Sequence, residues 1–307
     1  MHVGIVGGTG FTGGYLIDAL LAAGHSVAAL VRAGSENKLR HAEQVQVIAG
    51  NIDDKEALKA LFSNADAAIY NVGILREAPR KGITYESTQY QGAVDAIDAA
   101  KEAGVSRLLV MSANGVKKPG TRYQETKFRA DEYALKSGMD TTVIRPSVIF
   151  GDPRGTGEFG TQLRDDMVRP PIPAVNFFSG FNPKSGPIVI APVHVEDVAS
   201  AFLAALEDES TYGKTYELGG PEILTWKQMI SRVASAVGRN KWFIPMPIPL
   251  MRLAATLFDW IPIFPVTREQ LTMLEEGNVA DPAILESLTR RAPKPFNNGN
   301  LSYLNHL

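Results

Sequence analysis

The sequence lacks cysteine altogether, and its histidines are few. None of the 307 residues is Cys, which excludes disulfides, thiolate metal sites, iron–sulfur clusters and a cysteine nucleophile. The five histidines are scattered along the chain without the spacing that metal ligands share, so we predict no metal site. They stand at positions 2, 25, 41, 194 and 306.

The chain also has neither a large net charge nor a long apolar run. The 31 Lys and Arg nearly balance 33 Asp and Glu, which predicts no nucleic-acid partner. The N-terminus has no signal-peptide pattern. The most apolar segment, Trp242–Val266, contains five prolines and two charges, so we predict no transmembrane helix. We expect a cytoplasmic protein, and leave open a position at the inner face of a membrane.

Short apolar runs alternate with helical patterns through the first half of the chain. This alternation predicts an α/β fold, a doubly wound parallel Rossmann sheet with helices on both faces. The predicted strands are Val3–Val6, Ser26–Arg32, Val45–Ile48, Ala67–Val72, Leu108–Ser112, Thr142–Phe150 and Thr215–Leu218; the predicted helices are Gly13–Ala23, Asp53–Phe62, Tyr85–Ala103 and Tyr123–Ser137.

The amino-acid composition changes after the sixth predicted strand. Residues 151–192 are rich in Gly, Pro and Asn, and predict long loops with little regular structure. We therefore predict a Rossmann dinucleotide-binding domain over residues 1–150, to which a strand at 215–219 returns. Most of residues 151–307 would form a smaller C-terminal lobe on the substrate side.

A glycine-rich turn joins the first predicted strand to the first helix. The segment Gly7-Gly-Thr-Gly-Phe-Thr-Gly13 stands where a dinucleotide-binding turn belongs. Glycines let the backbone approach a pyrophosphate, and the helix N-terminus offers free N–H groups. A ligand-free glycine turn is the alternative, and the strand–turn–helix context favours dinucleotide binding.

The end of the second predicted strand bears on the choice of cofactor. A carboxylate there would bind the ribose of NAD, whereas this sequence has Arg32 and no acid until Glu36. A guanidinium suits the 2′-phosphate of NADP. We predict NADP(H) as the preferred cofactor with NAD(H) as the alternative, although a solvated surface arginine would have the same sequence.

Three residues near the fifth strand suggest proton transfer. Ser112 ends that strand, and Tyr123 and Lys127 share one face of the following helix. A neighbouring ammonium is expected to lower the phenol's pKa, and the serine hydroxyl would bind the reacting oxygen. An ordinary exposed Tyr–Lys pair is the alternative interpretation.

These motifs together resemble the short-chain dehydrogenase/reductase superfamily. The glycine pattern, Asn71-Val-Gly73, Tyr-x-x-x-Lys and Arg145-Pro-Ser-Val-Ile-Phe-Gly151 carry the resemblance. Within this superfamily, the sequence most resembles the atypical, extended-type members related to the nucleotide-binding accessory subunit of respiratory complex I. The stretches that support this resemblance are residues 192–199, 216–221 and 267–279.

The resemblance implies roles for the matching positions. Ser112, Tyr123 and Lys127 would be catalytic, with Lys127 also on the nicotinamide ribose. The cofactor would contact Gly7, Thr9, Gly10, Phe11, Thr12, Gly13, Arg32, Asn51, Ile52, Asn71, Val72, Gly73, Pro146 and Val148.

Two functions follow from the resemblance. One is NADP(H)-dependent hydride transfer to a nonpolar carbonyl or a quinone-like substrate. The other is a non-catalytic NADPH-binding accessory, assembly or sensing protein of a respiratory or quinone-synthesis complex. Gln89 stands where many active relatives have Asn, and the interval from Ser112 to Tyr123 is short. A transcriptional co-regulator is disfavoured because no DNA-reading element is visible.

Two further segments have open interpretations. His194, Glu196 and Asp197 precede an apolar helix, where the acids suit helix capping better than a role toward substrate. The apolar segment Pro249–Ile261 is predicted as a short helix of the second lobe. A wall for a lipophilic ligand, or a surface for a partner or a membrane interface, is its alternative role.

Overall fold

A computed structural model of the chain describes residues 1–182, 186–258 and 267–306, with the side chains of 254–258 excepted. The chain divides into two compact units. The first comprises Met1–Pro146, Val195–Leu218 and Ile284–Arg291. The second comprises Ser147–His194, Gly219–Ala283 and Ala292–Leu307.

The first unit is built on a seven-stranded sheet, all of whose neighbouring strands run parallel. The spatial order is β11-β6-β5-β4-β1-β2-β3, so the predicted doubly wound Rossmann sheet is confirmed. The strands are β1 His2–Val6, β2 Ser26–Val31, β3 Val45–Ala49, β4 Ala67–Tyr70, β5 Arg107–Met111, β6 Asp140–Pro146 and β11 Lys214–Leu218.

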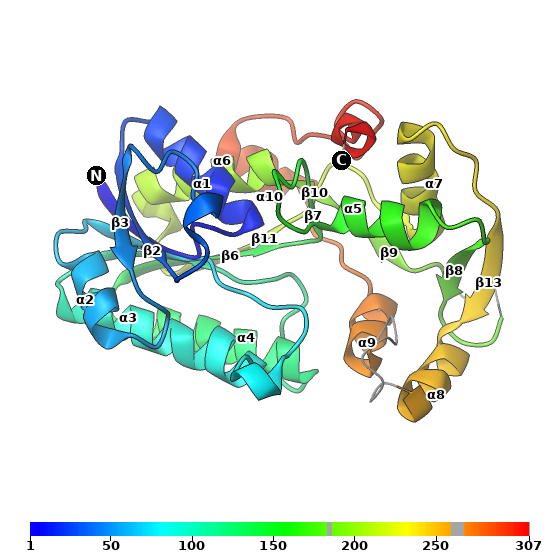
Figure 1. The fold of residues 1–307 in the computed structure, drawn as a ribbon, viewed down its shortest axis with the longest axis horizontal. Helices are drawn as coiled ribbons and strands as arrows, with labels where there is room; N and C mark the ends of the chain where they lie inside the picture. Colours follow the sequence, from blue (N-terminus) through cyan, green and yellow to red (C-terminus); the bar gives the residue numbers. More distant parts are fainter. Residues whose placement is uncertain (183–185, 259–266, 307) are drawn as a thin grey trace. The chain divides into compact units, whose positions relative to one another are not determined.

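Helices cover both faces of this sheet (Figure 1). Helices α2, α3 and α4 lie on one face, and α1 packs against α6 on the other. Because the sheet is covered on both sides, its inner strands β1, β2, β4 and β5 are buried at nearly every position. The edge strands β3 and β11 are largely exposed. The helices are α1 Phe11–Ala22, α2 Lys55–Phe62, α3 Gly92–Glu102, α4 Arg122–Leu135 and α6 Val195–Glu207.

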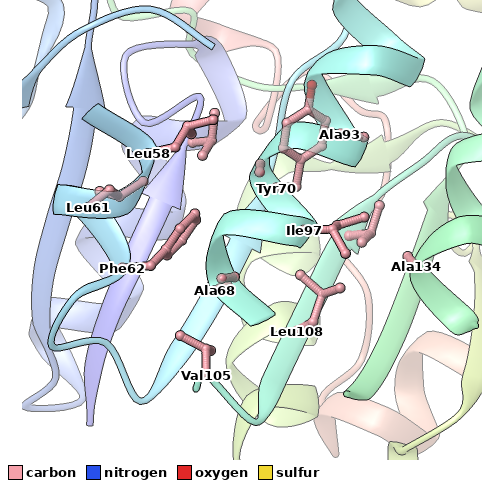
Figure 2. Packing of buried hydrophobic residues seen from close by; sticks show 14 of the residues in the cluster. Leu58, Leu61, Phe62, Ala68, Tyr70, Ala93, Ile97, Val105, Leu108 and Ala134 are labelled. Atoms are coloured by element: carbon pink, nitrogen blue, oxygen red, sulfur yellow. The ribbon is translucent and has the colours of Figure 1, made fainter. Parts of the chain in front are cut away.

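The core beneath α2, α3 and α4 joins side chains from helices and strands. Figure 2 shows Phe62 of α2 and Ile97 of α3 among Leu108 and Tyr70 of the sheet, all with exposures of 3% or less. The Tyr70 hydroxyl meets its hydrogen-bonding need by donating to the carbonyl of Thr88 at 2.6 Å. This core holds the carboxyl ends of β1, β4 and β5 in place.

The chain returns to the first unit through α6 and β11. β11 pairs with β6, from Lys214 opposite Thr142 to Leu218 opposite Pro146. The fully buried Arg107 on β5 donates to the hydroxyls of Thr142 and Thr211. Those bonds fasten the returning segment, which is why α6 belongs to the first unit although it follows residue 151.

Two predicted elements are divided in the structure. The predicted helix Tyr85–Ala103 begins as a π-helix, η3 Glu86–Gln91, and continues as α3. The predicted strand Thr142–Phe150 is split into β6 and the short β7 Ile149–Phe150, which pairs with β10 Val193–His194. In each case the apolar pattern continues through a change of backbone geometry that periodicity does not report.

The second unit contains more regular structure than predicted for residues 151–192. Its core packs Trp226 and Met229 against Phe177, with the Trp226 indole N–H donating to the carbonyl of Val175 at 3.0 Å. The remaining elements are α5 Phe159–Leu163, η4 Arg164–Val168, β8 Ala174–Phe178, β9 Val189–Ile190, β12 Leu224–Thr225, α7 Trp226–Ala236, β13 Phe243–Pro247, α8 Ile248–Phe258, α9 Arg268–Glu276, α10 Pro282–Thr289 (shared with the first unit) and η6 Ser302–Asn305. The prediction of long loops with little regular structure was wrong because short strands paired over long sequence distances carry almost no local signal.

Within the described ranges, we find no helix with both the length and the apolar content that a bilayer crossing requires. The helix predicted over Pro249–Ile261 corresponds to α8, and residues 259–261 lie outside the described part of the chain.

Candidate functional site

The glycine turn is a tightly packed junction between β1 and α1. Gly7 has φ +93°, and a Cβ there would lie 2.2 Å from the carbonyl oxygen of Asn71. A Cβ on Gly13 would lie 2.2 Å from the carbonyl oxygen of Gly7. Gly10 is the N-cap of α1 and supplies no side-chain cap, so the N–H groups of the first turn have no side-chain acceptor from it. This is the geometry that anion-binding helix N-termini use.

The residues after β2 and β3 line one cavity. Arg32 and Asn51 both border this space of about 290 Å3, together with Glu36 and Gly50. The Arg32 Nε donates to the buried Ser35 hydroxyl at 3.2 Å, which orients an otherwise exposed guanidinium. Among the described residues, no carboxylate forms an ion pair with Arg32. Its charge is therefore available to an anion.

The segment after β4 connects the glycine turn to α4. The Asn71 side-chain amide donates to the carbonyl of Gly7 at 3.2 Å. Two residues later, a Cβ on Gly73 would lie 3.4 Å from the Lys127 Nζ. Residues from three segments of sequence therefore gather at the carboxyl edge of the sheet, where dinucleotides bind in doubly wound folds.

Lys127 is a buried cation, only 6% exposed. Its Nζ donates to the carbonyl of Met111 at 3.3 Å. Burial lowers the pKa of Lys127 to about 8, while the negative charge of Asp131 acts in the opposite direction. An ammonium with this pKa titrates close to physiological pH.

Asp131 is the acidic member of the same helix face, one turn beyond Lys127 and 2% exposed. Its Oδ2 accepts from the Ser112 hydroxyl at 2.8 Å and from the Arg145 Nε at 2.9 Å. Burial raises the pKa of the Asp131 carboxyl, and the Arg145 charge and the Ser112 hydrogen bond oppose that rise. The Ser112 hydroxyl thus donates its hydrogen bond to Asp131, whereas the sequence suggested that it would bind a reacting oxygen.

Tyr123 differs from the sequence-based expectation in its electrostatics. Burial raises the pKa of the phenol, and the neighbouring Tyr85 and Asp131 raise it further. Lys127 does not lower it, because the ammonium reaches the Met111 carbonyl instead, and in the described part of the chain no hydrogen bond joins the Tyr123 hydroxyl to Lys127 or Ser112. The ring packs edge-on against Tyr85, with centroids 5.7 Å apart. Tyr123 is therefore a neutral phenol.

The other predicted site residues are distributed more widely. Thr9 and Thr12 lie in the glycine turn, and Phe11 packs edge-on against Tyr15. Ile52 and Val72 pack against the core rather than lining the cavity that Arg32 borders. Pro146 ends β6 in the first unit, whereas Val148 packs into the core of the second.

Gln89 and the two acids after His194 are in positions that support the local fold. The Gln89 amide donates to the carbonyl of Ile74 at 2.8 Å, and its oxygen accepts from the Thr126 hydroxyl at 3.4 Å. Gln89 thus ties the segment after β4 to α4. Glu196 and Asp197 lie in the first turn of α6, where their charge suits the helix dipole.

Three residues of the site were not identified from the sequence. Asp131 stands at i+8 from Tyr123 and i+4 from Lys127, so helical spacing alone places it on their face. Ser35 and Tyr85 gave no such signal, because each reaches its partner only through the folded chain.

Comparison with known proteins agrees with this geometry. Residues 7–173 match a family model described as NAD(P)H-binding, which is more than half of the chain. The chain belongs to this family. The NAD(P)H-binding match begins at Gly7 and extends past the Tyr123–Lys127 face.

Similarity to individual proteins indicates the subgroup of this family. This member is 30% identical to NADH dehydrogenase [ubiquinone] 1 alpha subcomplex subunit 9 of Arabidopsis thaliana, over 89% of this chain and 68% of that protein. It is 26% identical to a ceramide reductase of Caulobacter vibrioides, over 84% of this chain and 77% of that one. These matches, with the fold, identify an extended short-chain dehydrogenase/reductase related to the complex I accessory subunits.

The fold also matches a solved structure. A UDP-glucose 4-epimerase of Thermus thermophilus, solved with NAD, superimposes with a TM-score of 0.74 at 19% identity, covering all of this chain and 98% of that one. At this identity the comparison establishes the fold alone.

Proposed function

We propose that this protein is an NADPH-dependent reductase that transfers hydride to a nonpolar carbonyl or quinone-like substrate. The observation that carries the proposal is the face of α4 that holds the half-buried Tyr123 and the buried Lys127 and Asp131, with Lys127 next to Gly73. The relatives support a reductase, since one of them is named a ceramide reductase.

The residues present fit a dinucleotide. The cramped glycine turn leaves backbone N–H groups for the pyrophosphate, because any side chain at Gly7 or Gly13 would collide with backbone atoms. The oriented, unpaired Arg32 guanidinium favours the 2′-phosphate of NADP over the bare ribose of NAD. Lys127, next to Gly73, would hold the nicotinamide ribose.

The electrostatics favour reduction. The carbonyl carbon of the substrate would receive the hydride that NADPH supplies when it is bound. The raised pKa of Tyr123 keeps its hydroxyl protonated at physiological pH, so it suits donation of a proton to the developing alkoxide oxygen rather than its removal from an alcohol. Asp131, held by Ser112 and Arg145, opposes the effect of burial on the pKa of Lys127 and so favours the charged ammonium that would hold the ribose.

A single-turnover assay tests this proposal. NADPH absorbance is followed with purified protein against quinones and lipophilic ketones. Tyr123→Phe should abolish oxidation while leaving NADPH affinity within about twofold. Tyr133→Phe is the matched control: Tyr133 lies on the same helix and its hydroxyl donates to Asp98 at 2.6 Å, so its loss should not reduce turnover.

Coenzyme choice is tested separately. Arg32→Ala should weaken NADPH binding by about 10- to 100-fold, the value of one charge-assisted phosphate contact, and leave NADH binding unchanged. Equal losses for the two nucleotides would contradict the assignment of Arg32 to the 2′-phosphate.

A specific observation favours a second function. The Ser112 hydroxyl is committed to Asp131, and the Tyr123 hydroxyl has no hydrogen bond to Ser112 or Lys127 among the described residues. This arrangement also suits a protein that binds NADPH without turnover and serves a respiratory assembly. The Arabidopsis relative is named as a subunit of NADH dehydrogenase. Tight NADPH binding with no NADPH oxidation by any of the quinones or ketones, and no effect of Tyr123→Phe, would favour this second function.

A further inference from the structure

The second unit exposes large apolar side chains in segments that also carry two cations, Arg239 and Lys241. Trp242, which precedes β13, is 82% exposed, and Ile172, which precedes β8, is 65% exposed. Ile244 on β13 is 49% exposed. Monomeric soluble proteins rarely leave a large apolar cluster in water unless it binds something. We call these three residues together with Arg239 and Lys241 the Trp242 surface.

Hydrogen bonds join the segments that carry these residues. β8 and β13 run side by side (Figure 1), and the Ala174 N–H donates to the Trp242 carbonyl at 2.8 Å. The Arg239 guanidinium donates to the carbonyl of Arg169 at 2.9 Å, and the Lys241 ammonium to the carbonyl of Val168 at 3.1 Å. The segment before β13 therefore lies directly on the segment before β8.

The two cations have carbonyl partners but no carboxylate. In the described part of the chain, neither Arg239 nor Lys241 forms an ion pair, and burial together with the positive charge of Arg239 lowers the pKa of Lys241. Both line a cavity of about 550 Å3 with Ser231, Ser235 and Asn240. Two like charges held close together beside hydroxyl and amide groups favour a bound anion.

We propose that the Trp242 surface docks the protein on a membrane that contains anionic phospholipids. Trp242 and Ile172 would enter the boundary between headgroups and acyl chains, where the amphipathic indole is favoured. Arg239 and Lys241 would contact lipid phosphates from the adjacent cavity. Charge complementarity favours this occupant over an apolar protein groove, which would leave both cations unpaired. The docking residues lie in the second unit and go beyond the proposed reductase activity.

Vesicle co-sedimentation tests the proposal. The full chain should bind vesicles of phosphatidylcholine with phosphatidylglycerol, bind phosphatidylcholine alone at least tenfold more weakly, and dissociate at high salt. Trp242→Ser with Ile172→Ser should reduce binding at least tenfold, and Arg239→Gln with Lys241→Gln by about tenfold or more, at roughly fivefold per cation. Ile223→Ser and Lys59→Gln, exposed elsewhere, are the matched controls and should bind like the wild type.

A second readout guards against misfolded variants. Trp242 fluorescence should shift to the blue with the anionic vesicles, and the shift should be absent in Trp242→Phe. All variants should keep the wild-type thermal midpoint and NADPH affinity, so that failure of docking is distinct from failure of the reductase proposal. Equal binding to both vesicle types, or no binding by the wild type, would overturn the proposal, the latter leaving a protein partner as the occupant.

Discussion

Gly13 provides the sharpest test of how the glycine turn is built. Gly13 and Gly14 are adjacent in α1, and replacing either by Ala gains about 1 kcal/mol of helix propensity. Their surroundings differ. A Cβ on Gly13 would lie 2.2 Å from the Gly7 carbonyl oxygen and 2.8 Å from two backbone atoms of Gly8. A Cβ on Gly14 would meet only the flexible Arg40 side chain, at 3.1 Å.

These distances determine the sign of each effect. Backbone at 2.2 Å must move by nearly 1 Å, and overpacking of this kind costs about 3 kcal/mol or more, so Gly13→Ala should be destabilised by about 2 kcal/mol net. Gly14→Ala should be neutral or stabilised by up to about 1 kcal/mol, because Arg40 can swing away. For a chain of this size, 2 kcal/mol corresponds to a thermal midpoint about 3 °C lower.

The assay is thermal unfolding without nucleotide, followed by NADPH titration. Gly13→Ala should also lose NADPH affinity by about 10-fold or more, since the displaced Gly7 carbonyl is part of the turn that we propose holds the pyrophosphate. If Gly13→Ala were as stable as Gly14→Ala and bound NADPH normally, the close approach of α1 to the glycine turn would be refuted.

Three other outcomes concern α4 and its neighbours. The pKa of Lys127 is lowered to about 8, so NADPH affinity should be constant at acidic pH and fall as the pH rises through 8. The variant Lys127→Met has no charge to lose and should bind NADPH weakly, with an affinity that does not change with pH. Ser112→Ala leaves Asp131 with one hydrogen bond fewer and should lower the free energy of unfolding by about 1–3 kcal/mol, whereas Ser112→Thr should be close to wild type. An unchanged thermal midpoint with lost turnover would instead assign the hydroxyl to the reaction. Gly73→Ala adds a methyl at 3.4 Å from Lys127, an ordinary contact, so calorimetry should find wild-type stability and a reduced NADPH affinity; full affinity would place the cofactor away from Gly73.

Local patterns were sufficient for most of the first unit. The strand from Val3 to Val6, the glycine turn and the helix after it are each specified by residues within a dozen positions of one another. Helical spacing also placed Tyr123 and Lys127 on one face, where the structure has them. The same spacing would have placed Asp131 there, had buried acids been considered along with catalytic types.

The second unit shows where local reasoning ends. β8 pairs with β13 across some 70 residues, and β9 with β12 across more than 30. The pairing register of such short strands depends on contacts between distant segments, and their Gly- and Pro-rich surroundings favour loops on any local scale. The π-helical start at Glu86 is likewise invisible to a 3.6-residue period.

The sequence by itself determined the parallel α/β sheet, the dinucleotide turn and the Tyr123–Lys127 pair, because these depend on periodicity, glycine sterics and spacing along one helix. Only the tertiary structure decided the protonation chemistry of the site. The pKa of Tyr123 follows from burial, Tyr85 and Asp131, and that of Lys127 from burial and Asp131. The Ser112 hydroxyl donates its hydrogen bond to Asp131, whose carboxylate Arg145 also binds. Desolvation and charge act through space, so side chains far apart in the chain set the chemistry of residues that the sequence could only locate.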